Sequence, residues 1–232
     1  MPYVRSVARK AERVDIVFDT YIINSLKSTT REKRGTGIRT LVTAATKTSQ
    51  NLQAFLRVDD NKSDLIHFSA NLVCETTDIC EHILVTYDER IRCNTYIDKQ
   101  SFDPCSHEEV DTRPLLHCSY AARNGAKKVA IRTVDTDVVV LALAFFAQLG
   151  REELWINFGV GKYVRVIAAH NIASSLGVDK SRALPVFHAI TGCDTTSCFS
   201  HRGKKCLGNM ECLSRSDPGF LELCDLQLVD IK

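Results

Sequence analysis

Short runs of apolar residues alternate with longer amphipathic or polar segments along most of the chain. β-Branched and other apolar residues cluster at 14–18, 83–87 and 128–133, and each of these runs predicts a strand. Two further runs, Leu154–Phe158 and Tyr163–Ile167, flank a Gly159-Val160-Gly161 turn. A glycine-containing turn between two such runs is typical of a β-hairpin.

Helical patterns fill most of the segments between the strands. We predict helices over 3–13, 51–56, 63–72, 107–124, 138–149, 169–176 and 179–191. Asp59 and Asp60 are candidate caps for the third helix, and Ser106 with Glu109 has the spacing of a capping box for the fourth. Gly125 gives the fourth helix a normal C-terminal stop.

The alternation of strands and helices predicts an α/β fold with a largely parallel sheet. Ligands of such sheets bind at the carboxyl ends of the strands. Asp19, Asp135 and Asp137 follow two of the predicted strands and are therefore expected at that edge.

The composition is that of a globular protein but does not indicate a particular function. The chain has 232 residues, of which 44% are hydrophobic and 25% charged, as in an ordinary globular protein with one sizeable domain. Its formal net charge of +2 is too small to indicate nucleic acid by itself. The longest apolar run, Val138–Ala147, is too short to cross a bilayer, and no signal peptide opens the sequence. We therefore expect an intracellular protein without a membrane partner.

Ten cysteines lie along the chain without the dense spacing of a disulfide-stapled fold, so reduced thiols are expected. Cys193, Cys198, His201 and Cys206 form one possible zinc set. The gap between the first two exceeds that of a zinc knuckle, so buried or surface thiols are the favoured interpretation.

Acidic residues stand where predicted strands end and where one helix begins. They are Asp19, the pair Glu109 and Asp111, the pair Asp135 and Asp137, and Asp194. A lone aspartate after a strand is more often a turn residue or a helix cap, and glutamates in a first helical turn can simply complement the helix dipole. Two acids two positions apart after an apolar strand are harder to explain in this way. Convergence of several carboxylates on a divalent cation is the alternative.

Four segments, in order, resemble the flap-endonuclease and 5′-to-3′ exonuclease branch of the PIN-like superfamily. The first is Val17-Phe18-Asp19 with Leu26-Lys27 and the basic run from Arg31 to Arg34; the second is the Glu109-Val110-Asp111 helix start. The third is Thr133-Val134-Asp135-Thr136-Asp137, and the fourth is Gly192-Cys193-Asp194 with the basic stretch from Ser200 to Lys205. The whole chain also resembles a PIN-like module of animal proteins, many of them derived from mobile elements.

The resemblance implies a three-layer PIN-like α/β domain over 1–192 with a mainly parallel central sheet, and a helix–turn–helix-like segment over 193–232. The chain departs from the family pattern before Val14, where the family has a further strand ending in a metal-binding aspartate and this sequence has none. It also has Asp111 where the family usually has glutamate. Pro114 falls inside the helix predicted there, where proline normally costs about 3 kcal/mol.

The same resemblance implies a two-metal nuclease in which carboxylates hold Mg²⁺ or Mn²⁺ ions about 4 Å apart. The implied catalytic and metal-binding residues are Asp19, Glu109, Asp111, Asp135, Asp137 and Asp194. The implied contacts to the phosphate backbone of DNA or RNA are Lys27, Arg31, Arg34, Arg202, Lys204 and Lys205. No small-molecule cofactor is implied.

Two alternatives stay open. One is a catalytically inactive PIN-like module that binds nucleic acid or a protein, which the missing first strand favours. The other is a phosphatase of the haloacid-dehalogenase type, because Asp135-Thr136-Asp137-Val138 also resembles the nucleophile motif of that family. Asp135 would then be the nucleophile and Asp137 the general acid.

Overall fold

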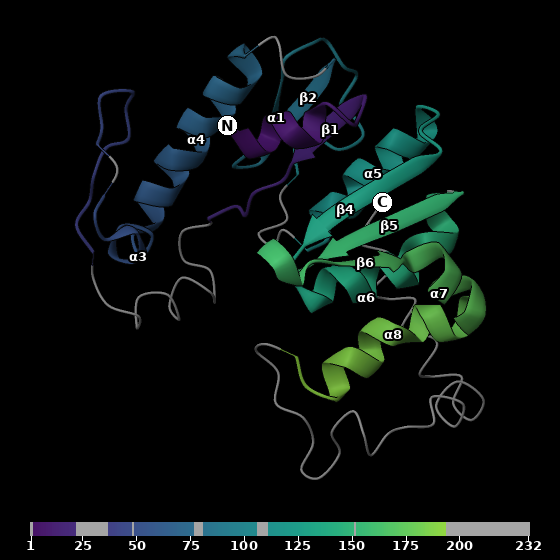
Figure 1. Ribbon diagram of the computed structural model, residues 1–232. Helices are drawn as coiled ribbons and strands as arrows, with labels where there is room; N and C mark the ends of the chain where they lie inside the picture. The colour runs from purple at the N-terminus through teal and green to yellow at the C-terminus, as the bar shows by residue number, and fades with distance from the viewer. Residues whose placement is uncertain are drawn as a thin grey trace. The chain divides into compact units, whose positions relative to one another are not determined.

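The computed structural model describes residues 2–21, 37–47, 49–76, 81–105, 111–150 and 152–193 (Figure 1). The pattern of contacts between residues divides the chain into two compact units, Met1–Arg113 and Pro114–Lys232. Each unit has its own three-stranded sheet and its own hydrophobic core. The α/β class is therefore confirmed.

The first unit contains a sheet in the order β1-β2-β3. β1 and β2 run parallel, with Val14 opposite Ile83, and β3 pairs antiparallel with β2. β3 is antiparallel because only a tight turn, with Asp88 at a φ of +46°, separates it from β2. The elements in chain order are α1 (Pro2–Ala8), β1 (Arg13–Ile16), α3 (Leu52–Phe55), α4 (Asp59–Glu75), β2 (His82–Tyr87) and β3 (Arg90–Cys93).

The central strand β2 organises the core of the first unit. Ile83 and Val85 are fully buried and pack with Val73 and Cys74 of α4 and with Ala8 of α1. Helix α4 accordingly lies along β2 in Figure 1. Removal of Cys74 from solvent is the main reason that its thiol pKa rises from 9.0 to about 11.

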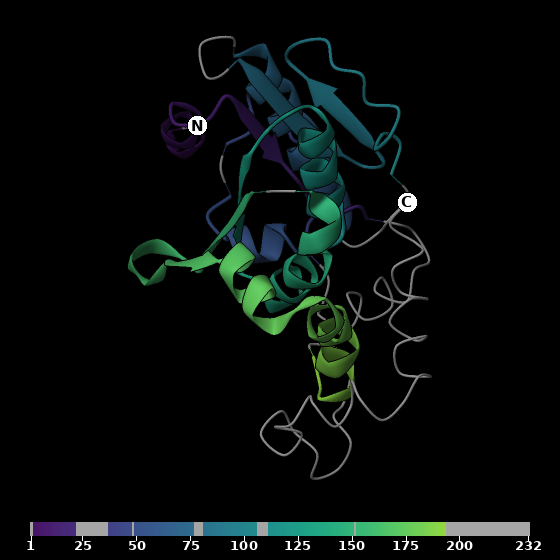
Figure 2. The same cartoon turned by 90° about the vertical axis from the view of Figure 1, so that its right-hand side faces the viewer.

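The second unit contains a sheet in the order β4-β5-β6, seen from two sides in Figures 1 and 2. β4 and β5 run parallel, with Thr133 opposite Phe158, whereas β5 and β6 form an antiparallel pair. Its elements are α5 (Arg113–Arg123), which begins at the boundary residue, β4 (Lys128–Thr133), α6 (Thr136–Phe145), η1 (Phe146–Leu149), β5 (Glu153–Phe158), η2 (Gly161–Tyr163), β6 (Arg165–Ala168), α7 (Ala169–Leu176) and α8 (Val178–Ile190).

Helix α6 lies at the centre of the second core. Its apolar sequence is buried over Ala142–Phe145, and α8 packs closely against it. Ile131 of β4 and Ile156 of β5 supply the sheet side of the same core. Because α6 packs against both the sheet and α8, the position of its first turn, which follows β4, is well defined.

Most predicted elements of the second unit are confirmed. They include strand 128–133, the hairpin, the apolar helix that begins near Val138, and the two helices before Thr191. The predicted mainly parallel sheet differs from the two mixed sheets of the described residues. The difference arises because β3 and β6 each follow their neighbour through a short connection, which forces antiparallel pairing.

Three helices differ clearly from the sequence prediction at one boundary. α1 ends at Ala8. α4 begins at Asp59, and its N-cap is Val58, which makes no side-chain capping bond, so the prediction that Asp59 or Asp60 caps this helix is wrong. The helix predicted from 107 begins at Arg113 in the described residues, and Asp111 lies in a turn. Pro114 therefore occupies the first turn of α5, where a missing N–H costs little.

Two predictions fall outside the described residues: the Ser106–Glu109 capping box and the helix–turn–helix-like segment after Cys193. Across the part of the chain that the structure describes, no helix has both the length and the apolar character needed to cross a membrane.

Candidate functional site

The end of β4 presents two carboxylates in a defined geometry. Asp135 is the N-cap of α6, and its Oδ1 accepts a hydrogen bond from the backbone N–H of Asp137 at 2.8 Å. The N–H of Asp135 in turn donates to Oγ1 of Thr133 at 3.0 Å. Capping therefore fixes the turn that carries both acids, and both remain half-buried at the carboxyl end of a parallel strand.

His188 reaches this turn from α8. Its Nε2 lies 2.8 Å from Oδ1 of Asp137. Because an ionised carboxylate can only accept, Nε2 carries the proton of this hydrogen bond. The histidine side chain is 11% exposed and that of Asp137 is 29% exposed, so the bond is partly shielded from water. Capping explains the position of Asp135 but does not explain this contact.

Cys193 is the third member of a group of side chains that could hold a metal ion. α8 ends with the Thr191 hydroxyl donating to the carbonyl oxygen of Phe187 at 2.7 Å, and Gly192 follows at a φ of +92°. This left-handed residue, which glycine adopts without strain, redirects the chain toward α6. Ligand atoms of Asp137, His188 and Cys193 consequently all lie within 4.8 Å of one another.

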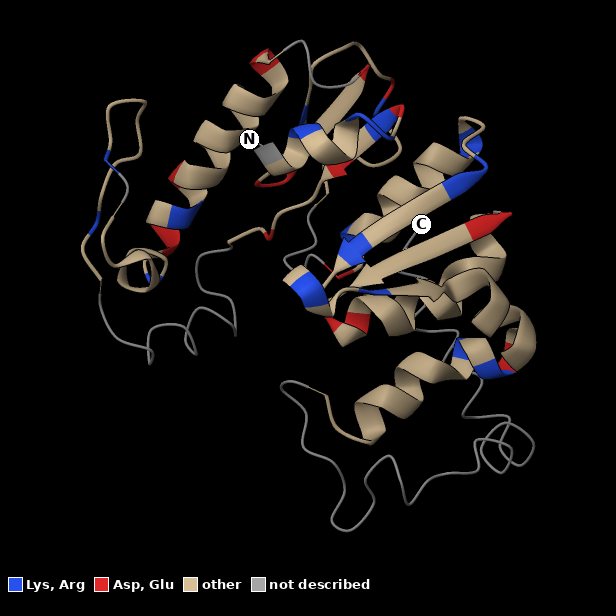
Figure 3. Ribbon diagram, in the orientation of Figure 1, with Lys and Arg blue, Asp and Glu red and all other residues tan. Residues whose placement is uncertain are grey.

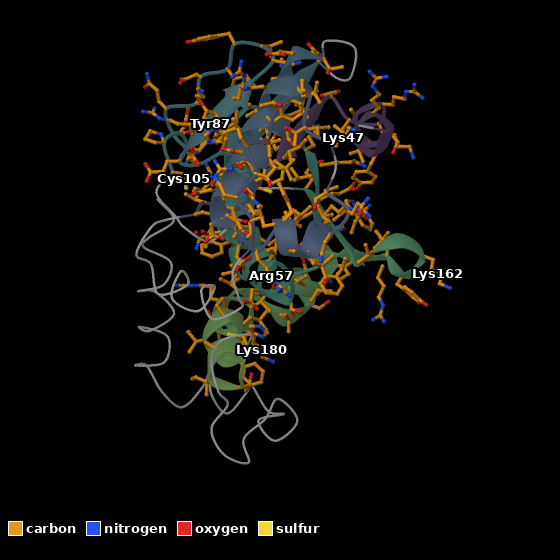
Figure 4. All side chains as sticks on the ribbon, turned by 90° about the vertical axis from the view of Figure 1, so that its left-hand side faces the viewer. Lys47, Arg57, Tyr87, Cys105, Lys162 and Lys180 are labelled. Atoms are coloured by element: carbon orange, nitrogen blue, oxygen red, sulfur yellow. The ribbon has the colours of Figure 1, made fainter. Side chains whose placement is uncertain are left out.

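A basic and aromatic hairpin leaves the same edge of the sheet. The N–H of Gly159 donates to the carbonyl oxygen of Thr133 at 3.0 Å, which joins the start of the hairpin to the strand end that precedes Asp135. Lys162 stands 5.2 Å from the ring centre of Tyr163, whose residue is 74% exposed. Figure 4 shows Lys162 projecting from the hairpin, and Figure 3 shows an acidic stretch at the start of α6 and the basic Lys162 of η2.

The shape of this hairpin depends on Gly159. The residue has a φ of +109°, and a Cβ atom added there would lie 2.8 Å from the carbonyl oxygen of Tyr163. A side chain would therefore collide with backbone as well as strain the turn. The projecting position of Lys162 and Tyr163 follows from this close backbone approach.

Asp19 and Asp111 belong to the first unit. Asp19 is exposed between two anchored neighbours: the N–H of Phe18 donates to Oγ1 of Thr86 at 2.7 Å, and the Thr20 hydroxyl donates to the carbonyl oxygen of Asp88 at 2.9 Å. It thus stands just beyond the carboxyl end of parallel β1, as predicted. Asp111 is half-buried in the turn before α5.

Arg113 braces the segment that carries Asp19. Its guanidinium, 1% exposed, donates to Oγ1 of Thr20 at 3.2 Å and to the carbonyl oxygens of Asp88 at 2.6 Å and Arg90 at 3.3 Å. Burial lowers its pKa. Arg113 is thus a structural residue of the first unit, and no local sequence pattern predicted this role.

The structure therefore brings together Asp135 and Asp137 from the predicted set and places Asp19 and Asp111 in the first unit. The remaining predicted residues lie outside the described part of the chain: Glu109, Asp194, Lys27, Arg31, Arg34, Arg202, Lys204 and Lys205. Cys198, His201 and Cys206, the partners proposed for Cys193 in a zinc set, lie outside it as well. His188 was not predicted, because one histidine in a helical segment carries no local signal of its distant partner.

Comparisons with known proteins add no family assignment. No protein-family model, no curated protein and no solved structure matches this chain.

Proposed function

We propose that the chain is a metal-dependent phosphodiester hydrolase of the nuclease type, with Asp135 and Asp137 at its reactive edge. The observation that carries the proposal is the pair of half-buried carboxylates at the carboxyl end of β4, one of which is held by His188. The PIN-like resemblance of the sequence supports the same assignment, including its three-layer fold and its expected Mg²⁺ or Mn²⁺.

The carboxylates fit a hard divalent cation in part. Oδ1 of Asp135 and Oδ1 of Asp137 are engaged in hydrogen bonds, and among the described residues neither Oδ2 has a hydrogen-bond partner. One oxygen of each residue therefore remains for a cation, and oxygen ligands suit Mg²⁺ and Mn²⁺. When bound, such an ion supplies an acidified water and stabilises charge on a phosphate.

The protein side of this chemistry is positioning. Asp135 fixes the first turn of α6, and His188 fixes the rotamer of Asp137 by donating to one of its oxygens. His188 is thus a positioning residue, since its contact is to the carboxylate. Small displacements of such groups cost large factors in rate, so a rigid helix start is a suitable support.

Nucleic acid is the proposed substrate because of the hairpin beside the carboxylates. Lys162 and Arg165 supply positive charge for phosphates, and the exposed ring of Tyr163 offers a stacking surface for a base. Contacts of these kinds select for single strands or strand junctions rather than for a base sequence. The hairpin contributes a binding surface that the sequence analysis did not predict.

Cleavage of labelled single-stranded and flapped DNA and RNA tests the proposal. The wild type is assayed with Mg²⁺, with Mn²⁺ and with a chelator, beside Asp135→Asn and the control Asp179→Asn, which changes an exposed acid in the first turn of α8. We expect metal-dependent cleavage that is lost in the Asp135 variant and retained in the control.

Two other outcomes would replace the proposal. Salt-sensitive binding without any cleavage would favour an inactive nucleic-acid-binding module. Hydrolysis of a small phosphomonoester without nucleic-acid affinity would favour the phosphatase.

A further inference from the structure

Asp137, His188 and Cys193 offer a mixed set of ligands that differs from the all-carboxylate set expected for Mg²⁺. One ligand is a carboxylate oxygen, one an imidazole nitrogen and one a sulfur, all within 4.8 Å of one another. We propose that these three side chains bind a zinc-type divalent cation, that is, a borderline-soft ion that accepts thiolate and imidazole. The inference goes beyond the proposed hydrolase, because it concerns cation binding whether or not the chain cleaves a phosphodiester.

The spacing of the ligand atoms is close to what one ion needs. Zinc bonds of about 2.0–2.3 Å at tetrahedral angles place neighbouring ligand atoms roughly 3.3–3.8 Å apart. The imidazole nitrogen and the carboxylate oxygen are 2.8 Å apart, and no pair in the group exceeds 4.8 Å. Ligand-atom shifts of about an ångström, within the reach of side-chain rotation, would therefore close the site.

A different local structure positions each of the three ligand residues. Asp137 stands on a capped helix start, His188 on the last turn of a helix packed against α6, and Cys193 follows the Gly192 turn. The backbone that carries the three ligands is thus set by helix ends rather than by the cation. A structural zinc site has four protein ligands, whereas three leave a position for water, as in catalytic zinc sites.

The ligand chemistry favours zinc over magnesium for this set. Thiolate and imidazole are poor ligands for Mg²⁺, which prefers oxygen, and are standard ligands for Zn²⁺. Binding would release the thiol proton of Cys193 to solvent. It would also require the His188 tautomer with its proton on Nδ1, so that the hydrogen bond to Asp137 is exchanged for shared coordination.

Occupancy by zinc would have a consequence for the proposed hydrolase, and this consequence rests on that proposal. Zinc would engage Asp137 and remove the His188 hydrogen bond that orients it. We therefore expect Zn²⁺ to inhibit cleavage supported by Mg²⁺, and the inhibition to be weaker when Cys193 is replaced.

Direct metal binding by the full, reduced chain tests the inference. Chelator-treated protein is titrated with Zn²⁺ against a chromophoric chelator, and with Co²⁺ to observe the thiolate-to-cobalt absorption band. We expect binding of one ion with a thiolate band in the wild type. Cys193→Ser should abolish that band, and both Cys193→Ser and His188→Ala should weaken zinc binding by at least about tenfold.

A rival ligand set provides the decisive control. Zinc bound through Cys193, Cys198, His201 and Cys206 would be weakened by Cys206→Ser and unaffected by His188→Ala. That pattern, or the absence of zinc binding in the wild type, would overturn the inference. His188→Gln repeats the test if the alanine variant fails to fold, as judged by circular dichroism. Zinc binding without nuclease activity would retain the inference and remove only the proposed function.

Discussion

Nε2 of His188 donates a hydrogen bond to Oδ1 of Asp137 at 2.8 Å, which ties the last turn of α8 to the first turn of α6. This contact has two effects. It stabilises the packing of two core helices, and it sets the direction of a carboxylate beside Asp135. Substitutions that separate these effects are therefore informative.

A double-mutant cycle on this pair should reveal coupling. His188→Ala leaves the half-buried Asp137 without its donor, and Asp137→Asn replaces a charged acceptor by a neutral one. Because the bond is charge-assisted and partly shielded, we expect a coupling free energy of about 1–2 kcal/mol, measured by denaturant unfolding. Additive effects of the two substitutions would show that the contact contributes nothing to stability.

Asp135 allows capping to be separated from chemistry. Asparagine caps helices about as well as aspartate, whereas alanine does not. Asp135→Asn should therefore unfold at nearly the wild-type denaturant concentration, and Asp135→Ala should lose about 1 kcal/mol. Both variants should lose metal-dependent cleavage. Full cleavage by Asp135→Asn would mean that the carboxylate serves only as a cap.

The sequence predicted the turn that carries Asp135 but not the contacts that complete the site. A strand run followed by Asp-x-Asp and an apolar helix is a local pattern, and the structure has it at β4 and α6. His188 and its partner Asp137 are 51 positions apart in the sequence, so no local pattern could predict their contact. Strand β3 was also missed, since a single buried residue, Ile91, lies between two arginines.

The exposed hairpin should contribute to nucleic-acid affinity. Lys162→Ala removes one phosphate-binding charge and should lower the slope of log K against log salt by about one. Tyr163→Ala should cost about 1–3 kcal/mol if a base stacks on the ring. Fluorescence anisotropy at several salt concentrations measures both effects.

Lys127→Ala is the matched control for the hairpin variants. This lysine is also exposed but immediately precedes β4, at the opposite end of the sheet from the hairpin. Equal losses of affinity for Lys127→Ala and Lys162→Ala would indicate unspecific attraction to a basic surface.

Burial of Cys74 predicts a loss of stability in alkali. Its folded pKa is about 11 against an ordinary value of 9.0, so above pH 9 the unfolded thiol ionises first. Between pH 9 and about pH 11 the folded state therefore binds more protons than the unfolded state. The free energy of unfolding falls across this range and is unaffected by this thiol below pH 9. Denaturant midpoints at about pH 8 and about pH 10 should therefore diverge more in the wild type than in Cys74→Ala.

The most direct test of a cation site at the end of β4 is Mn²⁺ binding to the chelator-treated full chain, followed by electron paramagnetic resonance. The wild type and the control Asp179→Asn should bind Mn²⁺ with the same affinity, and Asp137→Asn should bind it at least about tenfold more weakly. Equal Mn²⁺ affinity in Asp137→Asn and the wild type would contradict the assignment of this carboxylate to a metal.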